Sequence, residues 1–133
     1  MPVNMSYPKP RNIIKKYFQI LRTDSATEKC ALPRDAIVTS IKVTQTSAAV
    51  TGAGAFSLGW SGTTNALVNA FSMATTSVGQ AMVGTAVGAQ VGTKQSADRT
   101  IISTYAVGTS TSGGEGWVEL EYFVPGAGET HFS

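Results

Sequence analysis

Hydrophobic and polar residues alternate along four segments of the chain, residues 37–44, 56–60, 99–107 and 117–124. A period of two is typical of a β-strand that buries one of its faces. In the last segment, Val118, Leu120 and Tyr122 alternate with Glu119 and Glu121, which predicts an apolar face turned inward and an acidic face turned to solvent. The four segments together predict a core that includes Ile37, Ile41, Val43, Phe56, Leu58, Ile102, Val118, Leu120 and Tyr122.

Two further segments carry apolar residues spaced four apart, as on one face of a helix. Residues 13–21 are rich in β-branched and aromatic side chains, which favours a strand over the helix that this spacing also permits. In residues 65–73, Leu67 and Phe71 have the same spacing, and we expect a short helix or turn there.

Turn-forming sequences separate the apolar segments: Leu32-Pro33-Arg34-Asp35, Gly52-Ala53-Gly54, residues 61–65 and residues 108–116. Residues 77–93 contain a glycine at every fourth or fifth position, and we expect one or two short strands there from Met82, Val83, Val87 and Val91. About six to eight short strands between such turns indicate an all-β sandwich or barrel. The pattern does not separate a jelly roll from other Greek-key sandwiches.

A length of 133 residues indicates a single domain. Pro2, Pro8 and Pro10 fix their own φ angles and bias the residues before them towards extended backbone. We therefore expect residues 1–11 to form an extended N-terminal arm and residues 12–133 to form one β-sandwich domain.

Charged residues are scarce, at 14% of the chain against about a quarter in an ordinary soluble domain. Residues 43–93 contain none. Such a surface suits a protein that packs against copies of itself or against a partner. It suits an enzyme cleft poorly, because catalysis usually needs clustered acids, bases or metal ligands.

The charges that are present are unevenly distributed. Residues 1–22 contain five basic residues and no acidic one, whereas five basic and eight acidic residues follow from Thr23 onward. A basic arm on a mildly acidic body favours docking to an acidic protein neighbour, with a merely solvated arm as the alternative. Nucleic acid is not an expected partner, because the body has no basic stripe with interleaved aromatics.

Few residues could carry chemistry. Cys30 is the only cysteine and His131 the only histidine, which excludes an internal disulfide and a metal site built from these residue types. Glu119 and Glu121 share a strand face at about 7 Å, as glycosidase carboxylates do, but any amphipathic strand with an acidic face gives this spacing. We therefore expect no catalytic residues, no metal and no cofactor, and we expect Cys30 to be a small buried hydrophobe.

The two tryptophans have different expected roles. Trp60 falls in the inward-facing set of its strand, so it is expected in the core. Trp117 shares the face of the two glutamates, and we expect it at a subunit interface, where tryptophan is enriched. A row of exposed rings would instead indicate sugar binding.

Signals for export or membrane insertion are not evident in the sequence. Lys15 and Lys16 interrupt the first apolar stretch, so it lacks the uncharged core of a secretory signal. No apolar run reaches the roughly 18 residues of a membrane helix. We therefore expect the protein to stay in the compartment where it is made, with no membrane partner.

Several segments resemble a known family. The sequences LPRDAIVTSIKV at residues 32–43, GTT at 62–64, ADRTIISTYAV at 97–107 and GWVELEY at 116–122 resemble strands and turns of small structural proteins of tailed bacteriophages. The family is that of the jelly-roll capsid decoration, or cement, proteins, and the resemblance covers roughly residues 32–124. It implies a jelly-roll-like β-sandwich without catalytic residues, which lies on the outside of an expanded head and clamps neighbouring major capsid proteins.

The resemblance also implies the partners: the major capsid protein and copies of this chain, as a trimer or else a dimer, in a virion assembled in the bacterial cytoplasm. A tail, fibre or baseplate component is the alternative within the virion, and a carbohydrate-binding module is the alternative outside it. We expect the contacts to come from the arm, the first strand and one residue of the last strand: Lys9, Arg11, Ile13, Lys15, Lys16, Tyr17, Phe18 and Trp117.

Overall fold

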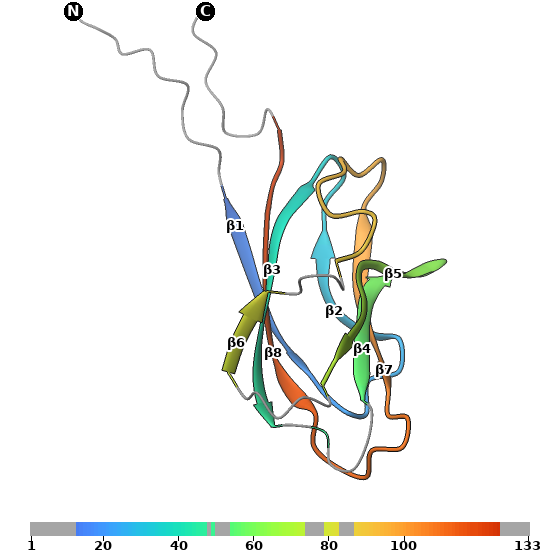
Figure 1. Ribbon diagram of the computed structural model, residues 1–133. Helices are drawn as coiled ribbons and strands as arrows, with labels where there is room; N and C mark the ends of the chain where they lie inside the picture. Colours follow the sequence, from blue (N-terminus) through green and yellow to red (C-terminus); the bar gives the residue numbers. More distant parts are fainter. Residues whose placement is uncertain (1–12, 48, 50–53, 74–78, 83–86, 126–133) are drawn as a thin grey trace, which may run out of the picture.

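The computed structural model describes residues 13–47, 49, 54–73, 79–82 and 87–125, which form two facing β-sheets (Figure 1). The strands are β1 (Ile14–Ile20), β2 (Thr27–Leu32), β3 (Ile37–Ser47), β4 (Ala55–Trp60), β5 (Thr63–Ser72), β6 (Gly79–Met82), β7 (Arg99–Ala106) and β8 (Glu115–Phe123). The first sheet has the order β1-β8-β3-β6, and the second has the order β2-β7-β4-β5. The predicted all-β sandwich is confirmed. The expected arm, residues 1–11, lies outside the described residues.

Strand pairing follows one long hairpin that is wound over itself. β1 pairs with β8, β2 with β7, β3 with β6 and β4 with β5, all antiparallel, so that the numbers of each pair add up to nine. Further ladders between β3 and β8, and between β4 and β7, complete the two sheets. This winding of eight strands into two sheets is the jelly roll. Pairing therefore selects the jelly roll among the Greek-key sandwiches that the sequence left open.

The core lies between the two sheets and is built from alternate residues of each strand. In β8, Val118 and Leu120 are fully buried, whereas Trp117 is 47% exposed, as the alternation predicts. Phe56 and Leu58 of β4 are fully buried in the second sheet. Each such side chain contributes about 1.5–3 kcal/mol on burial. The strand expected over residues 13–21 is also confirmed, as β1.

One predicted core position in β3 is wrong by a single residue. Val38 pairs with Tyr122, and Ser40 pairs with the preceding Glu121, so that Thr39 is an unpaired bulge residue. A bulge shifts the phase of the in–out alternation. Val38 is therefore fully buried where Ile37 was expected, while Ile41 and Val43 beyond the bulge face the core as predicted.

In β7, apolar residues are buried on both faces. Ile102 is buried as expected, at 9% exposed, but lies outside the core cluster, whereas its neighbour Ile101 is fully buried within it. When neighbouring residues are both large and apolar, a period of two does not fix which of them points inward. Strand pairing decides which of the two points towards the core: Ile101 stands opposite Cys30, and Ile102 stands opposite Gly59.

The short helix or turn expected over residues 65–73 is wrong, because this segment belongs to β5. Ser61 and Gly62 form a two-residue turn, with Gly62 at a φ of 90°, and Trp60 pairs with Thr63 directly after it. The spacing of Leu67 and Phe71 arises from irregular pairing, since the register shifts between these positions and Ala70 has a φ of 54°. A bulged strand thus imitates the period of a helix.

Residues 87–90 cover the edge of β5. The N–H of Gly88 donates to the carbonyl of Leu67 at 2.8 Å, and the N–H of Gln90 donates to the carbonyl of Ala66 at 2.9 Å. A Cβ atom on Gly88 would stand 2.2 Å from the Ala66 oxygen, so only glycine permits this approach. Part of the charge-free stretch is therefore covered by the chain itself. Of the strands expected within residues 77–93, β6 and a bridge from Val87 to Val68 are present.

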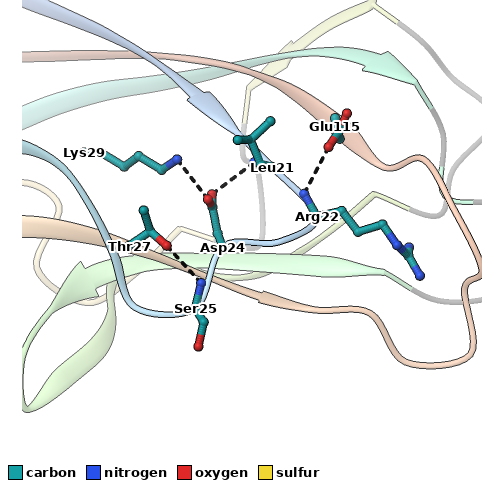
Figure 2. A network of polar contacts seen from close by, with 7 residues as sticks. All are labelled: Leu21, Arg22, Asp24, Ser25, Thr27, Lys29 and Glu115. Carbon is teal, nitrogen blue, oxygen red and sulfur yellow. Dashed lines mark hydrogen bonds and ion pairs between the residues drawn. The ribbon is translucent and has the colours of Figure 1, made fainter.

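A buried ion pair holds the connection from β1 to β2, where the chain crosses between the sheets. The carboxylate of Asp24 accepts a hydrogen bond from the N–H of Leu21 and another from Lys29 Nζ, both at 3.0 Å (Figure 2). The side chains of Asp24 and Lys29 are only 2% and 10% exposed. Lys29 reaches this position because it is a bulge residue between Glu28 and Cys30 in the ladder with β7.

The β1–β2 connection is also hydrogen-bonded to the connection between β7 and β8. The backbone N–H of Arg22 donates to Glu115 Oε2 at 3.3 Å (Figure 2), and its guanidinium donates to Ser110 Oγ at 2.6 Å. The N–H of Tyr105 donates to the carbonyl of Asp24 at 3.0 Å. These bonds hold the two crossing connections together at one end of the sandwich.

We expect Asp24→Asn to destabilise the protein by about 3–5 kcal/mol, because it leaves the ammonium of Lys29 buried without a counter-charge. Asp35→Asn is the matched control, since Asp35 and Lys94 are 47% and 60% exposed and an exposed pair contributes at most about 1 kcal/mol. Asparagine also tolerates the φ of 71° at position 35. Urea unfolding of both variants measures the difference, and equal losses would contradict the role of the buried pair.

Candidate functional site

Cross-strand pairing places nine side chains in three rows on the outer face of the first sheet. Residues that stand opposite each other in antiparallel strands point to the same side. Each row takes one residue from β1, one from β8 and one from β3. The rows are Lys15, Glu121 and Ser40; Tyr17, Glu119 and Lys42; and Gln19, Trp117 and Thr44. We call these nine residues the outer face.

Exposed hydrophobic residues gather on and beside the outer face. Six large hydrophobic residues of the described chain are more than a third exposed, and four of them lie on β8 or at β1. Tyr17 is 64% and Trp117 is 47% exposed on the outer face, and Ile13 and Ile14 lie at the start of β1. A cluster of exposed hydrophobic and aromatic residues is typical of an interaction surface.

The charges of the outer face largely neutralise each other. Lys15 Nζ lies 3.6 Å from Glu119 Oε2 and 3.8 Å from Glu121 Oε2. Thr39 Oγ1 lies 3.4 Å from Glu121 Oε1. The two carboxylates that match a glycosidase pair in spacing therefore share one lysine, so they form part of a neutral surface.

Two residues expected at an interface point inward. Phe18 pairs with Val118, is 6% exposed and belongs to the core cluster, so the interface expectation is wrong for this residue. Lys16 pairs with the buried Leu120 and is half-buried. Both lie on the alternate positions of β1 that face the second sheet, which is why they differ from Lys15 and Tyr17. The expected contacts Lys9 and Arg11 lie outside the described residues.

Lys16 lies near the single cysteine at the side of the sandwich where β1 and β2 meet. Cys30 is partly buried and packs against the core, as expected of a lone thiol. Burial raises the pKa of the Cys30 thiol, and the positive charge of Lys16 lowers it in part. The charge of Lys16 therefore acts on Cys30 inside the sandwich and not on the outer face. An inward-pointing charge on an edge strand such as β1 also opposes unwanted pairing with other chains.

A pocket of about 390 Å³ opens beside the second sheet, lined by Glu28, Trp60, Ser61, Asp98, Arg99, Thr100 and Ile102. Asp98 accepts a hydrogen bond from the N–H of Arg34 at 2.8 Å. The guanidinium carbon of Arg99 lies 4.9 Å from the ring centroid of Trp60, and its Nε donates to Gln95 at 3.2 Å. These contacts fix the start of β7. Trp60 itself is buried in the core cluster, as the sequence predicts.

The described part of the chain carries neither a cluster of metal ligands nor a membrane-spanning helix. No group of three or more His, Cys, Asp or Glu side chains in it could hold a metal ion. None of its elements is a helix long and apolar enough to cross a membrane. The outer face is therefore the candidate site. Alternation indicated the exposed side of each strand, but only pairing placed Lys42, Gln19 and Thr44 beside Trp117.

Comparison with known proteins gives matches to structures alone, since no protein-family model and no curated protein matches this sequence. A chain of the acid-stable capsid of the Helicobacter pylori bacteriophage KHP30 is similar in structure, with a TM-score of 0.69 and 11% identity. The match covers 96% of this chain and 100% of that chain. A chain of the capsid asymmetric unit of cyanophage Pam1 has a TM-score of 0.62 and 16% identity, with 94% of both chains covered.

Both similarities run nearly from end to end of each chain, so the matched chains are about as long as this one. At these identities the similarity lies in the fold. Two phage capsid structures therefore contain a chain with the fold of this protein.

We expect Lys16→Met to raise the pKa of Cys30 further, because it removes the charge that favours the thiolate. The thiolate is the reactive form, so alkylation by iodoacetamide at a fixed pH becomes slower and its pH midpoint moves upward. Lys42→Met, on the outer face of the same sheet, is the matched control and leaves the midpoint unchanged. The placement of Lys16 is contradicted if both variants titrate like the parent protein.

Proposed function

We propose that this chain is a non-enzymatic structural protein of a phage virion, which binds the outer surface of the head and stabilises the capsid by clamping neighbouring major capsid proteins. The observation that carries the proposal is the end-to-end similarity of its fold to chains from two phage capsids. The resemblance of the segments at residues 32–43, 97–107 and 116–122 to decoration proteins supports it independently of the structure.

The surface chemistry supports binding rather than catalysis. The carboxylates of Glu119 and Glu121 share Lys15, and Asp98 and Arg99 are engaged at the start of β7. The outer face carries two lysines and two glutamates, whose charges balance in number, and two exposed aromatic rings. Aromatic residues are enriched at protein interfaces.

A protein that decorates a shell stabilises it because many copies bind to the same particle. A stable interface buries about 1,200–2,000 Å² in total, which a domain of this size provides with a large part of one face and an arm. Many copies on one shell act together, so modest individual contacts add up to a large barrier to opening. The crossing connections held by Asp24 and Arg22 keep the body rigid, as a clamp between two neighbours requires.

The proposed setting is the exterior of a virion assembled in the bacterial cytoplasm. The proposed partners are the major capsid protein and copies of this chain, as a trimer, with a dimer as the alternative. The proposed contacts are the arm with Lys9 and Arg11, the start of β1 at Ile13, and the outer-face residues Lys15, Tyr17 and Trp117.

Expanded heads without tails provide the test. We expect the purified protein to bind them saturably, in many copies per particle, and to raise the temperature at which they open. A variant without residues 2–11 is expected to occupy the heads less, because the arm supplies part of the contact. Co-sedimentation measures occupancy, and cryo-electron microscopy of the decorated heads locates the added density.

Other outcomes contradict the proposal. Binding in a few copies to tails alone indicates a tail, fibre or baseplate component. Binding of the isolated protein to glycans, lost in Trp117→Ala, indicates a carbohydrate-binding module. Turnover of a glycoside that Glu119→Gln abolishes indicates a hydrolase. Unchanged occupancy after deletion of residues 2–11 removes the arm from the mechanism.

A further inference from the structure

We propose that the outer face binds the leading segment of a second copy of this chain, Pro8-Lys9-Pro10-Arg11. The prolines pack against the rings of Tyr17 and Trp117, and the cationic side chains lie beside the carboxylates of β8. This proposal rests on the proposed function, because it takes the chain to be a subunit of a multi-copy assembly.

The two exposed rings form a platform that the described chain leaves uncovered. Tyr17 stands opposite Glu119, and Trp117 stands opposite Gln19, so the two aromatic residues are diagonal neighbours on adjacent strands. Such positions are about 7–8 Å apart. Within the residues that the structure describes, neither ring contacts another ring or a cation. Surfaces lined by aromatic side chains recognise proline-rich extended segments.

The segment has the matching chemistry. Pro8 and Pro10 fix φ near the extended polyproline conformation, so the segment loses little backbone entropy when it binds. Lys9 and Arg11 are cationic, and no acidic residue accompanies them anywhere in residues 1–22. A cationic proline-rich segment therefore suits aromatic rings that lie beside carboxylates.

The carboxylates on the outer face can accept these cations. The side chains of Glu119 and Glu121 are 22% and 28% exposed, and Lys15 lies 3.6 and 3.8 Å from them. These separations are longer than a hydrogen bond, so an arriving guanidinium can donate to either carboxylate without displacing a hydrogen bond from Lys15. Lys15 still offsets part of the negative charge, which makes the rings the main source of affinity.

The reach of the chain keeps its own segment from spanning both rings, although Tyr17 alone lies within its reach. The described chain begins at Ile13, and Trp117 pairs with Gln19, about 20 Å further along the strand at roughly 3.3 Å per residue. Pro8 lies at most about 18 Å from Ile13 even in a fully extended chain. Reversal of direction shortens this reach further. The segment therefore reaches Trp117 only from another copy.

Binding between copies also matches the number of segments to the number of outer faces. Every copy carries one outer face and one segment, so each copy donates to one neighbour and accepts from another. A contact of this head-to-tail kind closes into a ring when the rotation between neighbours permits. A trimer in which each outer face holds the segment of the preceding subunit leaves no outer face empty.

Photo-cross-linking in the free full-length protein tests the proposal without shells. Tyr7 is replaced by benzoylphenylalanine, and equal amounts of unlabelled and ¹⁵N-labelled protein are mixed before irradiation. We expect cross-linked peptides that join one label to the other and map to β1 and β8. Cross-links confined to single chains, or between copies but on the second sheet, overturn the proposal.

Sedimentation equilibrium supplies a second measurement. Trp117→Ala and the double variant Pro8→Ala/Pro10→Ala are each expected to weaken self-association about tenfold or more, as loss of an aromatic anchor does. Val107→Ala is the control, because Val107 is also an exposed hydrophobic residue but lies in the β7–β8 connection. Equal urea midpoints for all variants exclude a general loss of stability. Self-association that is unchanged in both test variants overturns the proposal.

The outcomes distinguish this proposal from the proposed function. A protein that is monomeric alone and yet decorates heads overturns segment exchange and leaves the capsid function standing. A protein that exchanges segments but does not bind heads contradicts the capsid function and leaves segment exchange standing.

Discussion

The register of β8 is the constraint on which the rest of this structure depends. β8 is hydrogen-bonded to β1 on one side and to β3 on the other, so its pairing fixes which side chains of three strands share a face. Leu120 and its alternate neighbours turn into the core, and Trp117 and the glutamates turn out. A slip of one residue would exchange the two sets. The composition of the core and that of the outer face are therefore two consequences of one pairing.

The absence of charge from residues 43–93 is explained in part by packing within the chain. Residues 87–90 cover β5, and Gly88 approaches Ala66 too closely for any side chain. A charge at the buried positions Ala66, Leu67 or Val68 of β5 would be costly. The outer face is not poor in charge, because Lys15, Lys42, Glu119 and Glu121 belong to it. Their charges balance in number, and Tyr17 and Trp117 are its exposed aromatic residues.

The ends of the sandwich are built differently from its faces. At one end the ion pair of Asp24 and Lys29 is almost completely buried, and Arg22 joins the two connections that cross between the sheets. The bulge in β2 aims Lys29 at its partner. Polar groups here fix the geometry of the wound hairpin, whereas the outer face carries the exposed rings of Tyr17 and Trp117.

The sequence by itself determined the local elements, because alternation along 56–60, 99–107 and 117–124 is a property of neighbouring residues. It also determined that Trp60 is inside and Trp117 outside. The tertiary structure decided the rest. β2 is half-exposed and bulged, so its sequence lacks the alternation that identified the other strands. The bulge at Thr39 and the distorted β5 arise from pairing with distant strands, and no local pattern contains that information. Which strands pair, and hence which exposed side chains become neighbours, depends on contacts between residues far apart in the chain.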